Sequence, residues 1–249
     1  CLPDMDLALA AAIGMGLSVA ASLVTGASLL ARARRTREVP ELAIGVALFA
    51  GGGVAFPTLV LSVQALSQAP RLATLGLTIG TFLGHLGAAS LALAVRHLFR
   101  PEAGWARALQ LGLTTVLAGA LAARVLEPER VPSPGYVFWP GMAASFGCYA
   151  WSALESFACA RRLRQPAAGS APAPEAWRYA MWGLAATAAS GIFVGTIVGR
   201  AVDPFGLPDG VVLLQAALGV VAAVGIALAF LPIASERTLI SVRDGSRGR

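Results

Sequence analysis

The sequence predicts an all-α, polytopic membrane protein: a seven-transmembrane-helix bundle with its N-terminus outside and its C-terminus in the cytoplasm. Of its 249 residues, 57% are hydrophobic and only 13% are charged, which is about half the charged share of a typical soluble domain. Apolar runs of about 20 residues, enough to cross a hydrocarbon core of about 30 Å, recur along the chain. Arginine is distributed unequally between alternate connections, and this asymmetry indicates the orientation.

Seven apolar ranges, separated by breaks rich in Pro, Gly or charge, define the predicted helices. They are Leu7–Leu30, Leu42–Leu66, Leu72–Val95, Trp105–Leu126, Trp139–Ala160, Trp177–Val202 and Val211–Leu231. We expect residues 1–234 to form one transmembrane domain and residues 235–249 to form a basic cytoplasmic tail.

All 19 basic residues are arginine, and the connections divide them fifteen to four. The larger group is Arg32, Arg34, Arg35, Arg37, Arg96, Arg100, Arg107, Arg161, Arg162, Arg164, Arg178, Arg237, Arg243, Arg247 and Arg249. The smaller group is Arg71, Arg124, Arg130 and Arg200. Because positive charge accumulates on the cytoplasmic side, the larger group is assigned to the cytoplasm, in a bacterial inner membrane. The high pI of 10.2 then reflects topology, and no nucleic-acid partner is expected.

The sequence disfavours several cofactors. The chain has no lysine, so it cannot form a retinal Schiff base. Bis-histidine haem ligation needs a second deep histidine, but His97 follows His85 at the predicted cytoplasmic end of the same helix. No metal-ligand spacing or catalytic motif is present, so an enzyme is the less expected class. Cys148 and Cys159 are expected as small apolar residues, and Cys1 as the result of trimming or as a lipidated mature terminus.

A polar stripe on the third helix contains Thr74, Thr78, Thr81 and His85, and Arg96 returns to the same face. His85 is expected to be a neutral imidazole bonded across a helix contact, or alternatively part of a ligand site. A neighbouring face carries small residues at spacing four, which let helices approach closely in a membrane. These are Gly76, Gly80 and Gly84, and the sixth helix repeats the pattern with Gly191, Gly195 and Gly199.

The second helix carries Gly51, Gly52 and Gly53 near its centre, followed by Pro57. The proline removes a backbone hydrogen bond, which predicts a bend or a loosened turn. We expect a tightly packed outer half and a roomier inner half. The alternative is that these glycines are ordinary packing positions.

The fifth helix concentrates polar groups on one arc: Ser145, Cys148, Tyr149, Ser152, Glu155, Ser156 and Cys159. A carboxylate at the depth of Glu155 should face the bundle interior and find a partner, for which Arg96, Arg161 and Arg178 are candidates by depth. Two readings remain open. Glu155 either forms an internal ion pair that fixes this helix to a neighbour, or it handles a proton or a ligand.

The stretches "RRTREVPELAIGVALFAGGGVAFP" and "VRHLFRPEAGWARAL" resemble a family of bacterial multi-pass membrane proteins of unassigned role. The likeness lies in the arginine-rich first inner loop, the glycine-rich second span and the "FRP" turn, and it covers the first half of the chain. It implies a seven-helix fold and no particular activity. The arrangement is also similar to bacterial seven-helix sensor domains, although architecture alone does not specify function.

Three functions are compatible with this pattern. The first is a receptor-like or sensory protein that binds an unknown small ligand between the third and fifth helices and acts through a protein partner at the basic inner loops. The second is a structural or assembly subunit of a larger membrane complex. The third is a proton-linked transporter that uses Glu155 and His85.

Overall fold

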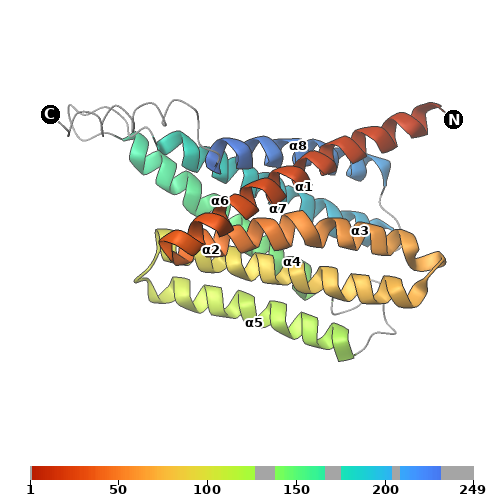
Figure 1. The fold of residues 1–249 in the computed structure, drawn as a ribbon, viewed down its shortest axis with the longest axis horizontal. Helices are drawn as coiled ribbons and strands as arrows, with labels where there is room; N and C mark the ends of the chain where they lie inside the picture. Colours follow the sequence, from red (N-terminus) through yellow and green to blue (C-terminus); the bar gives the residue numbers. More distant parts are fainter. Residues whose placement is uncertain (1, 127–137, 166–174, 204–207, 231–249) are drawn as a thin grey trace.

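A computed structural model describes residues 2–126, 138–165, 175–203 and 208–230. Within these ranges the chain forms helices and no strand (Figure 1). The elements are α1 (Leu2–Thr36), α2 (Val39–Val46), the π-helix η1 (Ala47–Ala55), α3 (Phe56–Gln64), the short 3-10 turn η2 (Ala65–Ser67), α4 (Pro70–Phe99), α5 (Gly104–Leu126), α6 (Phe138–Arg164), α7 (Ala176–Val202) and α8 (Asp209–Phe230).

These helices overlie the seven apolar ranges, and α2, η1, α3 and η2 follow one another within the second range. Six of the described helical segments are long and apolar enough to cross a membrane, so a helical membrane bundle is confirmed. The helix α6 is not among the six, because Ser, Glu, Gly, Tyr and Trp residues lower its hydropathy. The predicted tail (235–249), the residues 166–174 of the inner linker and the segment 127–137 lie outside the described residues.

Six helical segments close into a ring. The helix α1 packs on α8 and η1, α8 on α7, α7 on α6, α6 on α4, and α4 on η1. The main contacts of α5 are with α4 and α6. It lies at one edge of the bundle, beneath α4 in Figure 1. The ring therefore has an interior, and α5 lies outside it.

The ring is held together by small residues. Its buried positions are mostly alanine, including Ala55, Ala73, Ala92 and Ala94, each at 1% exposure or less. Large apolar side chains such as Leu61, Leu72 and Leu154 are instead exposed on the outside. Lipid is as apolar as leucine, so the membrane solvates these outer side chains while small residues let the helices approach closely.

Arginines gather where α1, α4 and α6 end. Their last turns contain Arg34, Arg35, Arg96, Arg161, Arg162 and Arg164, and these helix ends lie at the same end of the bundle (Figure 1). We call this the arginine-rich end. The last turns of α5 and α7, which run in the other direction, contain one arginine each, Arg124 and Arg200.

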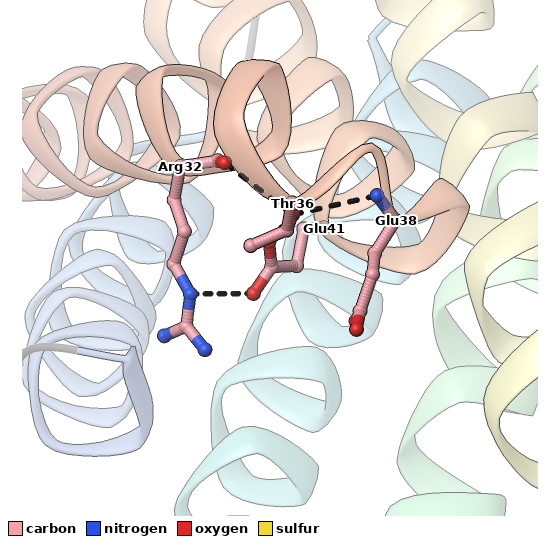
Figure 2. A network of polar contacts seen from close by, with 4 residues as sticks. All are labelled: Arg32, Thr36, Glu38 and Glu41. Carbon is pink, nitrogen blue, oxygen red and sulfur yellow. Dashed lines mark hydrogen bonds and ion pairs between the residues drawn. The ribbon is translucent and has the colours of Figure 1, made fainter.

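A polar network closes the tight turn from α1 into α2 (Figure 2). The Nε atom of Arg32 lies 2.6 Å from Glu41 Oε1, and the Thr36 hydroxyl donates to Glu41 Oε2 over 2.6 Å. The Glu38 N–H also points to Thr36 Oγ1 at 3.4 Å. Arg37 completes the reversal with a positive φ of 59°, a backbone conformation that is uncommon for residues other than glycine. The turn thus brings α2 back alongside α1.

Candidate functional site

The π-helix η1 is the main irregularity of the bundle. Pro57 cannot donate a backbone hydrogen bond, and its ring crowds the carbonyl four residues earlier, at Gly53. The preceding turns accommodate this by widening into nine π-helical residues that include Gly51–Gly53. The Thr58 hydroxyl donates to the Val54 carbonyl at 2.7 Å, which satisfies an acceptor that the irregular turns would otherwise leave weakly bonded. Long π segments are rare and often occur at functional sites.

The backbone of η1 touches the backbone of α4. A Cβ atom placed on Gly87 would lie 2.7 Å from Gly51 Cα and 3.2 Å from the Ala47 carbonyl oxygen. A Cβ on Gly51 would lie 3.7 Å from the Tyr149 hydroxyl, which reaches this contact from α6. The three elements meet here, and the contact excludes a side chain at Gly87, while a Cβ on Gly51 would lie 3.3 Å from Gly87 Cα. Gly87 is not part of the predicted glycine row.

A cavity of about 160 Å³ lies inside the ring. We call it the central cavity. Every ring element contributes to its wall, which includes Met15, Ser18, Val19 and Ser22 of α1, Ile44 of α2, Ala47, Leu48, Gly51 and Gly52 of η1, Phe56 of α3, Leu91 of α4, Tyr149 of α6, Trp182, Ala185, Ala186, Ala189, Ile192 and Phe193 of α7, and Gly219, Ala222, Ile226 and Phe230 of α8. Most of the wall is apolar, and its polar side-chain groups belong to Ser18, Ser22, Tyr149 and the indole of Trp182.

Aromatic rings form two sides of the central cavity. Tyr149 packs on Phe193 with ring centroids 5.3 Å apart, and Trp182 packs on Phe230 at 5.4 Å. Trp182 also contacts Phe99, at 5.5 Å, behind the wall. These paired rings hold one another in place, so the shape of the cavity is largely preformed. Single-sequence reasoning missed Trp182, Phe193 and Phe230, because apolar aromatics in an apolar helix carry no distinguishing signal.

Glu155 pairs with an arginine that was not among the partners expected from the sequence. The Arg100 Nε atom donates to both carboxylate oxygens, at 2.9 Å and 3.1 Å, and the Glu155 side chain is only 8% exposed. The expected partners Arg96, Arg161 and Arg178 were therefore wrong. Arg100 follows the last turn of α4, where the chain turns before α5, and this turn carries its guanidinium back over α6. The guanidinium also lies 5.8 Å from the centroid of the Trp105 ring, and the hydrogen bonds to Glu155 raise the pKa of Arg100 above its ordinary value.

His85 lies between α4, α5 and α6, on a side of α4 away from the central cavity wall. Its Nε2 atom is 3.0 Å from the position of a Cβ on Gly141, so the ring packs tightly against this glycine of α6. The same Cβ position on Gly141 is 3.4 Å from the Ala120 Cβ of α5. The buried Nδ1 atom has no hydrogen-bond partner among the described residues. The sequence did not single out Gly141.

The threonine stripe of α4 bonds to its own helix. The hydroxyls of Thr74, Thr78 and Thr81 donate to the carbonyls of Pro70, Thr74 and Leu77 at 2.7–3.0 Å. Each hydroxyl hydrogen is used locally, so the stripe contributes no free donor. Farther along the helix, Arg96 donates to the Gln110 amide oxygen of α5 at 3.3 Å.

The polar arc of α6 is buried in the bundle. Ser145, Cys148, Ser152 and Ser156 are all 4% exposed or less. The Ser156 hydroxyl donates to the Ser152 carbonyl at 2.7 Å, while the Ser152 hydroxyl has no partner among the described residues. Of this arc, Tyr149 reaches the central cavity. The structure therefore does not bring His85, Glu155 and Tyr149 into one pocket.

The predicted glycines lie at helix contacts of unequal tightness. A Cβ on Gly76 would collide with Ser62 Oγ, one on Gly80 would lie 2.8 Å from the Leu59 side chain, and one on Gly84 would have ordinary room beside Ala55. On α7, a Cβ on Gly191 would lie 2.8 Å from Leu218 of α8, and one on Gly195 would lie 3.6 Å from Gln215. Gly199 is buried. Elsewhere, a Cβ on Gly52 would lie 2.6 Å from Ser22 Oγ, and one on Gly53 would lie 2.5 Å from the Leu23 side chain.

One polar contact between α7 and α8 was not anticipated. The Gln215 amide donates to Thr196 Oγ1 at 2.9 Å and points to the Ile192 carbonyl oxygen at 3.3 Å. Gln215 is 6% exposed, so this buried amide fixes the register of the two helices.

Within the described residues, no group of three or more His, Cys, Asp or Glu side chains is placed to hold a metal ion. Comparison of the chain with protein-family models, with curated proteins and with solved structures found no match.

Proposed function

We propose that this chain is a receptor-like integral membrane protein that binds a small apolar ligand in the central cavity and acts through a protein partner. The observation that carries the proposal is the cavity itself, about 160 Å³ in volume and walled by all six ring elements. An apolar cavity of about 150 Å³ in a protein core stays dry and takes up benzene-sized molecules. The expected ligand is therefore apolar and about the size of a single ring or a short branched chain.

The position of the π-helix favours a cavity whose ligand changes the conformation of the protein, as in a receptor, over a cavity that only holds a ligand. Ala47, Leu48, Gly51 and Gly52 of η1 line the cavity, so a ligand would touch the most irregular segment of the bundle. A ligand can shift a conformational equilibrium only as far as its affinities for the two conformations differ. Wide π turns and ordinary α turns expose different faces of these four residues, which provides such a difference.

The proposal includes a topology. Seven spans, with α6 as the fifth, place the arginine-rich end in the cytoplasm by the positive-inside rule, in the inner membrane of a bacterium. The polar arc of α6 is compatible with spanning because it is buried between α4, α5 and α7. The partner would dock at the arginine-rich end. Reporter fusions at residue 249 test the orientation: cytoplasmic GFP should fluoresce there, and periplasmic alkaline phosphatase should be inactive.

The experiment for the cavity compares two leucine substitutions on α7. Ala189→Leu fills the cavity wall, whereas Ala201→Leu adds the same atoms at an exposed position of the same helix. Native mass spectrometry of the protein, extracted gently from its own membrane, should show a small-molecule adduct on the wild type and on Ala201→Leu. The adduct should be absent from Ala189→Leu. Equal adducts on all three proteins, or none on the wild type, would contradict a ligand in this cavity.

A second function is favoured by a different observation. The Arg100–Glu155 pair ties α6 to the end of α4, as expected of a structural subunit whose main property is rigid packing. Under that reading, the extracted protein carries a stoichiometric protein companion and no small molecule. The same native spectra therefore distinguish the two functions.

A further inference from the structure

A hollow on the outer surface of the bundle lies at the arginine-rich end of α6. It is lined by Phe157, Ala158, Arg161, Arg162 and Gln165. Both arginines are exposed and belong to the last turn of the helix. The floor is fixed because the Phe157 ring packs on Gly183 of α7, where a Cβ would lie 2.9 Å from the ring. We call this the α6 hollow.

An apolar strip leads along α6 into the hollow. Phe146, Leu154 and Phe157 are 36%, 70% and 42% exposed. At 100° per residue these three positions share an arc of about 80°, and Arg161 falls within it. The exposed face thus changes from apolar to cationic within one turn, at the end of the helix. A phospholipid changes in the matching order, from an apolar acyl chain to an anionic phosphate.

No carboxylate of the described residues pairs with the positive charge in the hollow. Among the described residues, neither Arg161 nor Arg162 has a carboxylate within salt-bridge distance, and Glu155, about two turns before them, is held by Arg100. By contrast, Arg32 at the end of α1 is paired with Glu41. Each guanidinium presents a planar fork of N–H donors, which suits phosphate oxygens better than an ammonium charge would.

We propose that the α6 hollow is a binding site for an anionic phospholipid, with the headgroup phosphate on Arg161 and Arg162 and an acyl chain along Phe146, Leu154 and Phe157. All five lining residues belong to α6 or directly follow it, and arginines at the cytoplasmic end of a membrane-spanning helix attract anionic lipid headgroups. The proposal rests on α6 crossing the bilayer and is independent of any ligand in the central cavity. The apolar strip favours a lipid over a free phosphate ion, because an ion has no apolar chain to pack against the strip.

The test titrates phosphatidylglycerol into the delipidated, detergent-solubilised full chain and counts bound lipid by native mass spectrometry. Phosphatidylcholine serves as the zwitterionic probe. R161Q/R162Q is compared with R34Q/R35Q, which removes the same charge from exposed positions in the last turn of α1. We expect phosphatidylglycerol to bind R161Q/R162Q about thirtyfold more weakly than the wild type, since each juxtamembrane arginine strengthens binding to anionic lipid by about fivefold.

Three results would overturn the proposal. Equal weakening in R34Q/R35Q would indicate a general charge effect, and equal binding of phosphatidylcholine would indicate an unselective apolar contact. Full displacement by millimolar inorganic phosphate would indicate a free-anion site. If R161Q/R162Q does not fold, the single variants R161Q and R162Q replace it, and each should lose about fivefold. Leu154→Gln supplies an independent readout: it should weaken phosphatidylglycerol binding while leaving the two arginines in place.

Discussion

The contact between Gly87 of α4 and Gly51 of η1 gives the sharpest stability prediction. An added methyl on Gly87 would lie 2.7 Å from Gly51 Cα, 3.0 Å from Gly51 N and 3.2 Å from the Ala47 carbonyl oxygen. Carbon atoms in van der Waals contact lie about 3.5–4.0 Å apart, so Gly87→Ala must move α4 and η1 apart by about 1 Å. All three clashing atoms belong to the backbone, so no side-chain rotation can relieve the overlap.

Overpacking of this kind costs about 1–3 kcal/mol, and the absence of a movable side chain places Gly87→Ala at the upper end, about 3 kcal/mol. The matched control is Gly119→Ala on α5, where no atom lies within 4 Å of the added methyl. Replacing an unconstrained helix glycine by alanine stabilises the helix by up to about 1 kcal/mol. The free energies of unfolding of the two variants should therefore differ by about 3–4 kcal/mol.

Unfolding in mixed micelles, with SDS as the denaturant and tryptophan fluorescence as the signal, measures both variants on one scale. The separation should also disturb the Tyr149 hydroxyl beside Gly51, so any cavity ligand should bind Gly87→Ala more weakly. A Gly87→Ala protein as stable as Gly119→Ala would refute the reasoning, because the close backbone approach would then not exist in the membrane protein.

Three further predictions use the same unfolding assay. Glu155→Gln should lower the unfolding midpoint, because breaking a buried ion pair leaves Arg100 without its partner. The double replacement Glu155→Leu/Arg100→Leu should recover much of this loss, because replacing both charges by apolar groups costs less than breaking the pair. If the double variant shows no recovery, the result counts against an internal ion pair. Gln215→Leu should cost about 0.6–1.7 kcal/mol through loss of the bond to Thr196, and an unchanged stability would show that this bond contributes nothing. Pro57→Ala restores a backbone hydrogen-bond donor and should shorten η1. Amide hydrogen exchange should then show stronger protection around Gly53. Unchanged protection would mean that the proline does not cause the π turns.

Much of the architecture could be predicted from the sequence because a bilayer imposes simple length and polarity rules. The seven apolar ranges and the helices overlap closely, and helix starts at Trp105, Trp139 and Trp177 lie within one residue of those observed. The predicted loosening before Pro57 corresponds to η1, although the sequence did not specify a π-helix. Proline chemistry is local, so a local pattern is sufficient to predict it.

The candidate site was less predictable, because it depends on which faces meet. Depth along the membrane normal favoured Arg96, Arg161 or Arg178 as the partner of Glu155, yet Arg100 reaches it from the turn after α4. A helical wheel describes straight helices and omits the turn that carries this side chain back over α6. Likewise, His85 and Glu155 were grouped by their polarity, while the cavity wall is formed by alanines, glycines and aromatic rings.

The sequence alone determined that this chain is a helical membrane protein, where its helices run and which bundle end carries the arginines, because hydropathy and charge are properties of single residues and their spacing. Only the tertiary structure decided the ring, the exclusion of α5 from it, the central cavity and the pairing of Arg100 with Glu155. These features arise from contacts between residues far apart in the chain. Because the helices of this bundle are all apolar, many alternative helix pairings would bring together residues of similar composition. The shapes of the helix surfaces therefore decide which pairings form, and the sequence pattern does not show those shapes.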